Sequence, residues 1–413
     1  MRMRNMKQKE TEEKNMKKLF SLLLALAMLI SLCAAAGAEG VTTITFWHTY
    51  GDQETPILDE ILIPMFEAAN PDIKVEAVRQ SGDFNQMVVT ALGTGVVPDI
   101  ARVDITKTSA YAKLGGIIAM DELEGFAALK DAVLEGPLST NIWNGHYYGL
   151  PLNTNCKAAV INLEQMKALG FDGAPATMEE FIAACKEKAP GEFKLNVSGV
   201  GDWDLYPYFW LFGGVLTDEG FTTASGYLDS EASVNAIKAI LQMHDDGVFT
   251  IRDIDGTPDA WDGINSQYAM FFEGPWFPFS EGIVPAPIPT YDGTTASVVG
   301  GENIVIFEGS KNKEAAFRFL QFMLSEEAQL ELLKVGVIPT LRSLVENEAV
   351  TADPKWSVYM KQLESAKSRI PTPQASTVEQ LWSDAMNMIF LEGADIQETL
   401  AFTAAEIDIE LAK

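Results

Sequence analysis

The stretch TTITFWHTYGDQETPILDEILIPMFEAANPDIKVEAV, residues 42–78, decides the fold class of this chain. Residues 42–47 alternate polar and apolar side chains and are rich in β-forming residue types, so they predict a first strand. Residues 55–70 place their apolar side chains on one broad helical face, and Asn70-Pro71-Asp72 ends that helix. Residues 73–78 then predict a second strand, so the stretch forms a strand–helix–strand unit.

The same alternation continues beyond this unit. Residues 84–92 predict a second helix, which glycines close, and residues 98–103 predict a third strand that ends at Asp104. Repeats of this kind join parallel strands through right-handed crossovers. We therefore expect an α/β fold with parallel-type sheets and flanking helices. Capping residues further along predict helix starts after Thr177 and Ser325.

Length and charge limit the possible functions. The chain has 413 residues, enough for two domains, and 58 acidic against 30 basic residues give a formal charge of −28. Such a chain repels nucleic acid and anionic lipid, so we expect neither as a partner. The sequence contains no Cys/His cluster with zinc spacing and no common catalytic motif. We therefore expect no metal, no cofactor and no enzymatic activity.

The N-terminus has the features of a targeting segment. Lys17 and Lys18 precede an apolar run at residues 19–33, and small residues follow it. This pattern predicts a signal peptide over residues 1–38 with cleavage after Ala38 and with Met16 as the natural start. The alternative is cleavage before Cys33 with a lipid anchor, but the bulky Leu32 before it favours free secretion.

Either route makes the chain secreted or extracytoplasmic, in the periplasm or at the cell surface. Cleavage after Ala38 would leave Cys156 and Cys185. The two could pair in an oxidising compartment, although nothing in the sequence requires it.

Several phrases in order along the mature chain resemble one known family. They are ITFWHTY (44–50), PDIARVD (98–104), LGGIIAMDEL (114–123), YYGLPLNTNCKAAVIN (147–162), AMFFEGPW (269–276) and VVGGENIVIFEGSKNKEAAFRFLQFMLSEEAQ (298–329). By these phrases the chain resembles the extracellular solute-binding proteins of bacterial ABC importers, in the maltose-binding-protein-like, sugar-binding family. The resemblance covers essentially the whole mature sequence.

This resemblance implies a type II periplasmic-binding-protein-like fold, in which two α/β lobes close on a ligand cleft. It implies a monomer that captures a mono- or oligosaccharide and delivers it to the membrane permease of an ABC transporter. The expected N-terminal lobe comprises residues 39–150 plus about 300–340, and the expected C-terminal lobe comprises 151–299 plus about 345–413. Hinge crossings are expected near residues 149–155, 298–303 and 338–345.

Sugars offer flat C–H faces to aromatic rings and hydroxyl rims to polar side chains, so a sugar site combines both. The resemblance assigns Trp276, held by the Gly274-Pro275 turn, to such a site, while Phe271 and Phe272 before it are expected in the core. The segment DWDLYPYFWLFGG (202–214) resembles the family segment that contributes a stacking ring, and by spacing back from Gly213-Gly214 Trp203 is the closest match to that ring. The full set of expected ligand-binding residues is Trp47, His48, Tyr50, Asp104, Asn153, Trp203, Tyr206, Trp276, Glu302, Arg342 and Trp382.

Other functions stay open at the level of sequence. The family also includes binders of sugar phosphates and of other solutes, and carboxylates beside Trp suit a polyamine through cation–π contacts. A surface protein that senses a ligand is a further alternative. A glycoside hydrolase would need two carboxylates across a cleft, and the sequence singles out no such pair.

Overall fold

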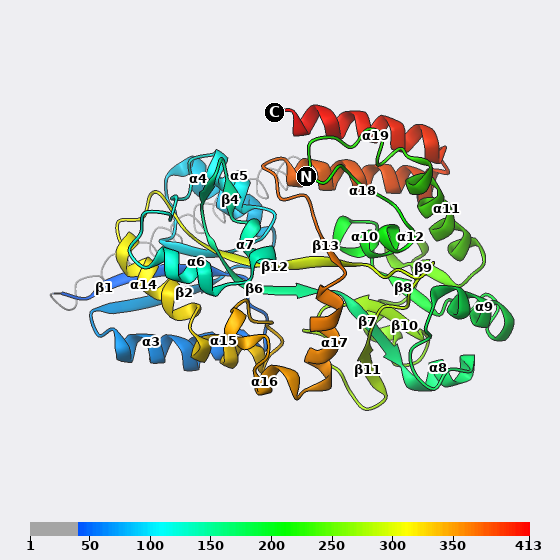
Figure 1. Ribbon diagram of the computed structural model, residues 1–413, viewed down its shortest axis with the longest axis horizontal. Coiled ribbons are helices and arrows are strands. Elements are labelled where there is room, and N and C mark those ends of the chain that lie inside the picture. The colour runs from blue at the N-terminus through cyan, green and yellow to red at the C-terminus, as the bar shows by residue number, and fades with distance from the viewer. Residues whose placement is uncertain (1–39) are drawn as a thin grey trace, which may run out of the picture.

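The computed structural model describes residues 40–413. The predicted signal peptide, its cleavage site and Cys33 lie outside the described residues. The described chain forms two α/β lobes side by side, and β6, β12 and β13 run between them (Figure 1). The expected two-lobe α/β fold is thus confirmed.

The sheet of the first lobe begins with the predicted strand–helix–strand unit. Strand β1 (Thr42–His48) lies between β2 (Ile73–Arg79) and β3 (Ile100–Asp104) and is parallel to both. The connection from β1 to β2 is one continuous helical segment, α2 (Thr55–Ile57), a π-helical turn (Leu58–Leu62) and α3 (Ile63–Ala69). Helix α4 (Phe84–Thr94) ends at Gly95, whose φ of 74° suits glycine.

Long strands carry the chain between the lobes. Strand β12 (Ser297–Ile306) is antiparallel to β3 through its second half and antiparallel to β6 (Leu150–Cys156) along most of its length. The first residues of β12 also pair in parallel with β13 (Ala366–Ser368). The strand order is therefore β13-β12-β3-β1-β2, with β6 on β12.

The second lobe has its own sheet, in the order β11-β7-β10-β8-β9. Strand β7 is antiparallel to both neighbours, whereas β8 is parallel to β9 and β10. These strands are β7 (Ala158–Asn162), β8 (Leu195–Val197), β9 (Phe249–Ile251), β10 (Met270–Glu273) and β11 (Ile283–Ala286). The main helices around this sheet are α8 (Leu163–Leu169), α9 (Met178–Lys188), α10 (Asp202–Leu211), α11 (Glu231–Asp245), α18 (Ala375–Glu392) and α19 (Ile396–Leu411).

The predicted helix caps are present. The side chain of Thr177 accepts a hydrogen bond from the Glu180 amide at the start of α9, and Ser325 does the same for the Ala328 amide of α15 (Glu326–Leu333). The remaining elements are α5 (Thr108–Lys113), α6 (Phe126–Ala132), α7 (Glu135–Ser139), β4 (Ile142–Trp143), β5 (His146–Tyr147), α12 (Arg252–Asp255), α13 (Ala260–Gly263), α14 (Lys313–Met323), a 3₁₀ turn (Arg342–Leu344), α16 (Glu348–Thr351) and α17 (Pro354–Leu363).

The position of the third crossing, which the sequence places near residues 338–345, stays a prediction. Ile338 and Leu344, near the expected third crossing, are buried in the core of the first lobe. Val350 of α16 and Trp356 of α17 pack in that same core, whereas α17 also contacts β7 and β11 of the second lobe, and its Tyr359 hydroxyl donates to the Glu273 carbonyl at 2.9 Å. Helix α17 therefore contacts both lobes, and β13 runs between them after it.

Each lobe has a separate hydrophobic core. Cys156 is buried in the core of the first lobe and Cys185 in that of the second, and both thiols are free. Between residues 40 and 413, no group of His, Cys, Asp and Glu side chains could hold a metal ion. Within the same range, no helix combines the length and the apolar character that a membrane crossing needs.

Candidate functional site

Polar side chains form a row across the strands where the lobes meet. Glu302 of β12 is the register partner of Asp104 on β3 and of Asn153 on β6. Gly300 is likewise the partner of Asn155. Side chains alternate between the two faces of a sheet, and register partners share a face. The row therefore places acid and amide groups from distant parts of the sequence on one face.

Gly300 leaves room for two of the groups around this row. A Cβ atom at Gly300 would lie 2.3 Å from Asn155 Oδ1 and 2.7 Å from the Trp203 ring. Any side chain here would displace the amide or the indole. The next residue, Gly301, has a φ of 133°, which only glycine adopts without strain.

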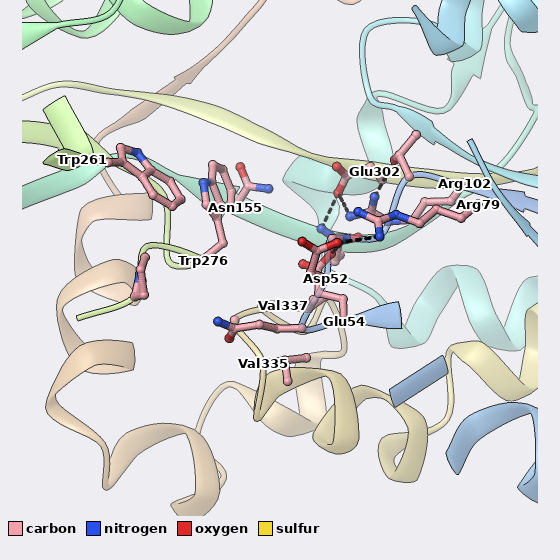
Figure 2. Close-up of a pocket in the computed structure, with 16 residues that line it drawn as sticks. Asp52, Glu54, Arg79, Arg102, Asn155, Trp261, Trp276, Glu302, Val335 and Val337 are labelled. Atoms are coloured by element: carbon pink, nitrogen blue, oxygen red, sulfur yellow. Dashed lines mark hydrogen bonds and ion pairs between the residues drawn. The ribbon is translucent and has the colours of Figure 1, made fainter. Parts of the chain in front are cut away.

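A cavity of about 520 Å³ opens beside the row, between the lobes. Figure 2 shows its two unlike walls, with charged side chains of the first lobe on one side and the indoles of Trp261 and Trp276 on the other. Its volume lies within the range of about 300–1,000 Å³ that is usual for small-molecule sites. We call this cavity the inner cavity. Its charged wall consists of Asp52, Glu54, Arg79, Arg102 and Glu302.

Both arginines of the charged wall already have carboxylate partners. Arg102 is only 5% exposed, and its Nη2 lies 2.7 Å from Glu302 Oε2. Its Nη1 donates to Thr49 Oγ1 at 2.8 Å, and its guanidinium lies 4.4 Å from the centre of the Tyr50 ring. Arg79 Nη1 lies 2.6 Å from Asp52 Oδ1. The wall therefore offers hydrogen-bonding groups rather than free positive charge.

Glu302 is the centre of this wall. It accepts a hydrogen bond of 2.6 Å from Asn153 Nδ2 in addition to its ion pair with Arg102. Burial raises the pKa of Glu302, while the charge of Arg102 opposes that shift. The Oδ1 atoms of Asn153 and Asn155 are buried without a hydrogen-bond partner among the described residues. The partly exposed Glu302 carboxylate beside the inner cavity suits a ligand that donates hydrogen bonds, as hydroxyl groups do, whereas the two amide oxygens are covered by the protein.

The aromatic wall is held rigidly. The Trp276 ring folds back over Gly274, where a Cβ atom would lie 2.3 Å from the indole. The ring stacks on Trp203, with centroids 5.9 Å apart and an angle of 27° between the planes. Trp261 donates from Nε1 to Glu273 at 2.9 Å and meets the Phe277 ring edge-on. Fixed indoles of this kind form flat apolar faces for a ligand.

Beside Trp203, an ionic network joins the lobes. Arg369, which follows β13, lies 2.7 Å from Asp104 of the first lobe and 3.5 Å from Asp202 of the second. Lys107 of the first lobe lies 2.7 Å from Glu379 of α18. Burial tends to raise the pKa of Asp104, but the charge of Arg369 and hydrogen bonds from Thr106 outweigh it and hold that pKa below its ordinary value.

The structure brings part of the predicted site together. Asn153, Trp276 and Glu302 line the inner cavity. Trp203 lies behind Trp276 and supports it, while Asp104 lies in the same polar row but is paired with Arg369. The ligand contacts of these residues stay predictions, because the described structure holds the protein alone.

Other predicted residues lie elsewhere, each for a physical reason. His48 and Tyr50 are buried beneath the charged wall, where Tyr50 packs under Arg102. Tyr206 and Trp382 meet edge-on in the core of the second lobe, and the Trp382 indole donates to the Val200 carbonyl at 2.9 Å. None of these four side chains lines the inner cavity.

Two further residues differ from expectation. Trp47 lies on the opposite face of β1 from Phe46 and lines a separate hollow against α4. Arg342 is exposed in the 3₁₀ turn and does not reach the inner cavity. Asp52, in the loop between β1 and α2, pairs with Arg79, and no side chain caps α2.

Sequence reasoning did not single out Glu54, Arg79, Arg102 or Trp261. Arg102 could have been predicted as a site residue, because it lies two residues before Asp104 in the same strand and its side chain therefore points to the same face of the sheet. Trp261 had none, since it belongs to the short helix α13 and reaches the cavity only through the folding of the second lobe.

The buried His48 leads to a testable pH effect. Burial, helped by the charge of Arg102, lowers the pKa of His48 to about 4. Between pH 4 and about 6.5, the unfolded chain binds a proton at this residue that the folded chain does not. The free energy of unfolding should therefore fall as pH drops through this window, by about 2–3 kcal/mol in total.

Chemical denaturation of the wild type and of His48→Gln at pH 7 and pH 4.5 measures this effect. The variant should lose less stability than the wild type on acidification. His146→Gln is the matched control, because His146 is exposed. Equal losses in the wild type and in His48→Gln would show that His48 does not resist protonation.

The family model and the most similar relatives agree that this chain resembles bacterial solute-binding proteins. Residues 62–358 match the family model described as bacterial extracellular solute-binding protein. The chain is 25% identical to the diacetylchitobiose binding protein DasA of Streptomyces coelicolor over 363 residues, which cover 80% of this chain and 84% of DasA. It is 24% identical to the sn-glycerol-3-phosphate-binding periplasmic protein UgpB of Escherichia coli over 348 residues, which cover 77% of this chain and 79% of UgpB.

A solved structure shares the fold. The GacH receptor of Streptomyces glaucescens, solved unliganded and with acarbose, superposes with a TM-score of 0.81 at 23% sequence identity. The match covers 91% of this chain and all of that one.

Proposed function

This chain belongs to the bacterial extracellular solute-binding protein family, and we propose that it captures a neutral carbohydrate between its lobes and delivers it to the permease of an ABC transporter. The observation that carries the proposal is the composition of the inner cavity. The Trp276 indole faces a wall that Glu302, Asn153 and Asn155 line and in which the Glu302 carboxylate is partly exposed. Sugars match this division, because their C–H faces stack on rings and their hydroxyl rims donate hydrogen bonds.

The charges of the inner cavity favour a neutral ligand over an anionic one. A phosphate or carboxylate group would need a free cation, but Arg102 and Arg79 are engaged by Glu302 and Asp52. The charge of the ligand distinguishes the relatives, because UgpB is named for an anionic solute and DasA for a neutral sugar. The second candidate is a polyamine, which the carboxylates near two indoles favour.

The proposed role also specifies where the protein acts and which molecules it binds. We propose an extracytoplasmic protein that acts as a monomer, binds no nucleic acid and catalyses no reaction on its ligand. The family supports the location and the transporter partner. The acidic composition, with a formal charge of −28, supports the exclusion of nucleic acid.

A ligand screen tests this function. We expect the purified protein to gain thermal stability in proportion to the logarithm of sugar concentration above Kd, because a ligand that binds only the native state stabilises it by mass action. The panel contains maltose, cellobiose, N,N′-diacetylchitobiose, sn-glycerol-3-phosphate and spermidine. A gain in melting temperature that rises with the concentration of one sugar, with that sugar recovered unchanged, supports the proposal. Stabilisation by spermidine alone would show that the ligand is a polyamine rather than a neutral sugar. Stabilisation by glycerol phosphate alone would show that the ligand is anionic.

A further inference from the structure

The Trp203 indole, in the first turn of α10, lies against the strands that run between the lobes. Lys157 directly follows β6, Gly300 lies in β12, and Arg369 directly follows β13. A Cβ atom at Gly300 would lie 2.7 Å from the Trp203 ring. Lys157 Nζ and the Arg369 guanidinium lie 5.3 Å and 5.6 Å from the centre of that ring. One indole of the second lobe therefore meets residues from β6, β12 and β13 or from their ends, which Figure 1 shows running from lobe to lobe.

Each of the two cations also pairs with an acid next to Trp203. Lys157 Nζ lies 2.9 Å from Asp204 Oδ1, and Arg369 Nη1 lies 3.5 Å from Asp202 Oδ2. Both cations are buried, and both lie within the distance of about 6 Å at which an aromatic ring attracts a cation. Because Asp202, Trp203 and Asp204 are consecutive in one helical turn, each ion pair holds its cation beside the ring. We call these five residues the indole clamp.

The indole clamp is attached to more than α10. The carbonyl oxygen of Lys157 accepts a hydrogen bond of 2.6 Å from Ser297 Oγ at the start of β12. Arg369 Nη2 donates to Asp104 Oδ2 of the first lobe at 2.7 Å. The positions of both cations are therefore set by the strands between the lobes, while the ring between them belongs to the second lobe.

The indole clamp also reaches the wall of the inner cavity. The Trp203 ring stacks on Trp276, and Trp276 lines that cavity. Among the described residues, no ion pair, hydrogen bond or cation–π contact joins Lys157 or Arg369 to Trp276 directly. An effect of these two cations on the Trp276 ring therefore passes through Trp203.

We propose that Trp203 is a positioning residue, which Lys157 and Arg369 hold in place and which fixes the Trp276 ring relative to the strands between the lobes. Aromatic rings stack within a narrow range of distances and angles, so a shift of these strands relative to α10 changes the stack. A ring that is fixed in advance spares a ligand the cost of ordering it. The inference concerns the protein without ligand, so it does not depend on which solute the inner cavity binds.

Circular dichroism of the ligand-free protein tests this role, because two stacked indoles give an exciton couplet whose size depends on their distance and angle. Trp203→Phe removes one indole but keeps a ring, so its difference from the wild type defines the contribution of the pair. We expect Lys157→Met to lose roughly half of this contribution or more, since stacking is sensitive to small shifts of either ring. Lys194→Met is the matched control, because Lys194 is a buried lysine of the second lobe that pairs with Glu192 at 3.0 Å without a cation–π contact.

The thermal transition of each variant establishes that it is folded. Retention of the full couplet in Lys157→Met would overturn the inference, as would an equal loss in Lys194→Met, which would indicate a general loosening of the lobe. The absence of any couplet difference between the wild type and Trp203→Phe would overturn the stack itself. Asp204→Asn takes the place of Lys157→Met if that variant does not fold, because it removes the carboxylate that holds Lys157 Nζ beside the ring. An unchanged couplet in folded Asp204→Asn would also contradict the role of Trp203.

Discussion

Trp276→Ala is expected to weaken ligand binding at least tenfold, and on the order of 30-fold if the lost contact is worth about 2 kcal/mol, as is usual for a central tryptophan. The reason is its position in the wall of the inner cavity, where its ring offers a flat apolar surface to a ligand. The stack on Trp203 and the turn at Gly274 hold this ring before any ligand arrives. Truncation therefore removes a preorganised surface, and calorimetric titration with the sugar found in the screen measures the loss.

Trp47→Ala is the matched control for this prediction. Trp47 is also partly buried, but it lines a different hollow against α4. Its truncation should leave affinity unchanged within about twofold, and Trp276→Phe should retain part of the affinity because a smaller ring remains. Circular dichroism and the thermal transition establish that each variant is folded. Unchanged affinity in a folded Trp276→Ala protein would remove this residue from the site.

The fold was predictable because its signals are local and periodic. The alternation in residues 42–47 and the helical face of residues 55–70 correspond to β1 and the helical segment α2–α3. The caps at Thr177 and Ser325 needed only their neighbours along the chain. The third crossing is hard to place from sequence, because Trp356 of α17 packs in the first core while Tyr359 of the same helix bonds to the Glu273 carbonyl of the second lobe, and both contacts join residues far apart in the chain.

The site was harder to predict because it depends on which way each ring points. Trp382 was expected at the cleft, yet Val378, Trp382 and Ile389 follow helical spacing on the buried face of α18. Their helical periodicity indicates that Trp382 lies in the core. This local pattern is stronger evidence than the family resemblance, whose alignment with this helix can shift by one or two residues. Arg369 and Asp104 are 265 residues apart in sequence, so no local pattern could pair them.

Arg369→Met is expected to lower the free energy of unfolding by about 3–5 kcal/mol, the usual cost of removing one partner from a buried ionic cluster. Arg369 is only 9% exposed, and Asp104, Asp202 and Glu379 all lie within 4.0 Å of its guanidinium. Without it, these carboxylates would face each other with Lys107 as their remaining cation. Arg318→Met is the control, because its pair with Asp72 is exposed and should contribute at most about 1 kcal/mol.

The same change should alter how the lobes sit, because the network joins Asp104 of the first lobe to Asp202 of the second through Arg369. Repulsion across the cleft favours separated lobes, so the radius of gyration of Arg369→Met in X-ray scattering should increase while that of Arg318→Met does not. A smaller closed population also weakens apparent affinity in proportion, although Arg369 does not line the inner cavity. Trp276→Ala should therefore lose affinity at an unchanged radius, whereas Arg369→Met should lose affinity, stability and compactness together. An Arg369→Met protein as stable and compact as the control would mean that the network does not hold the lobes.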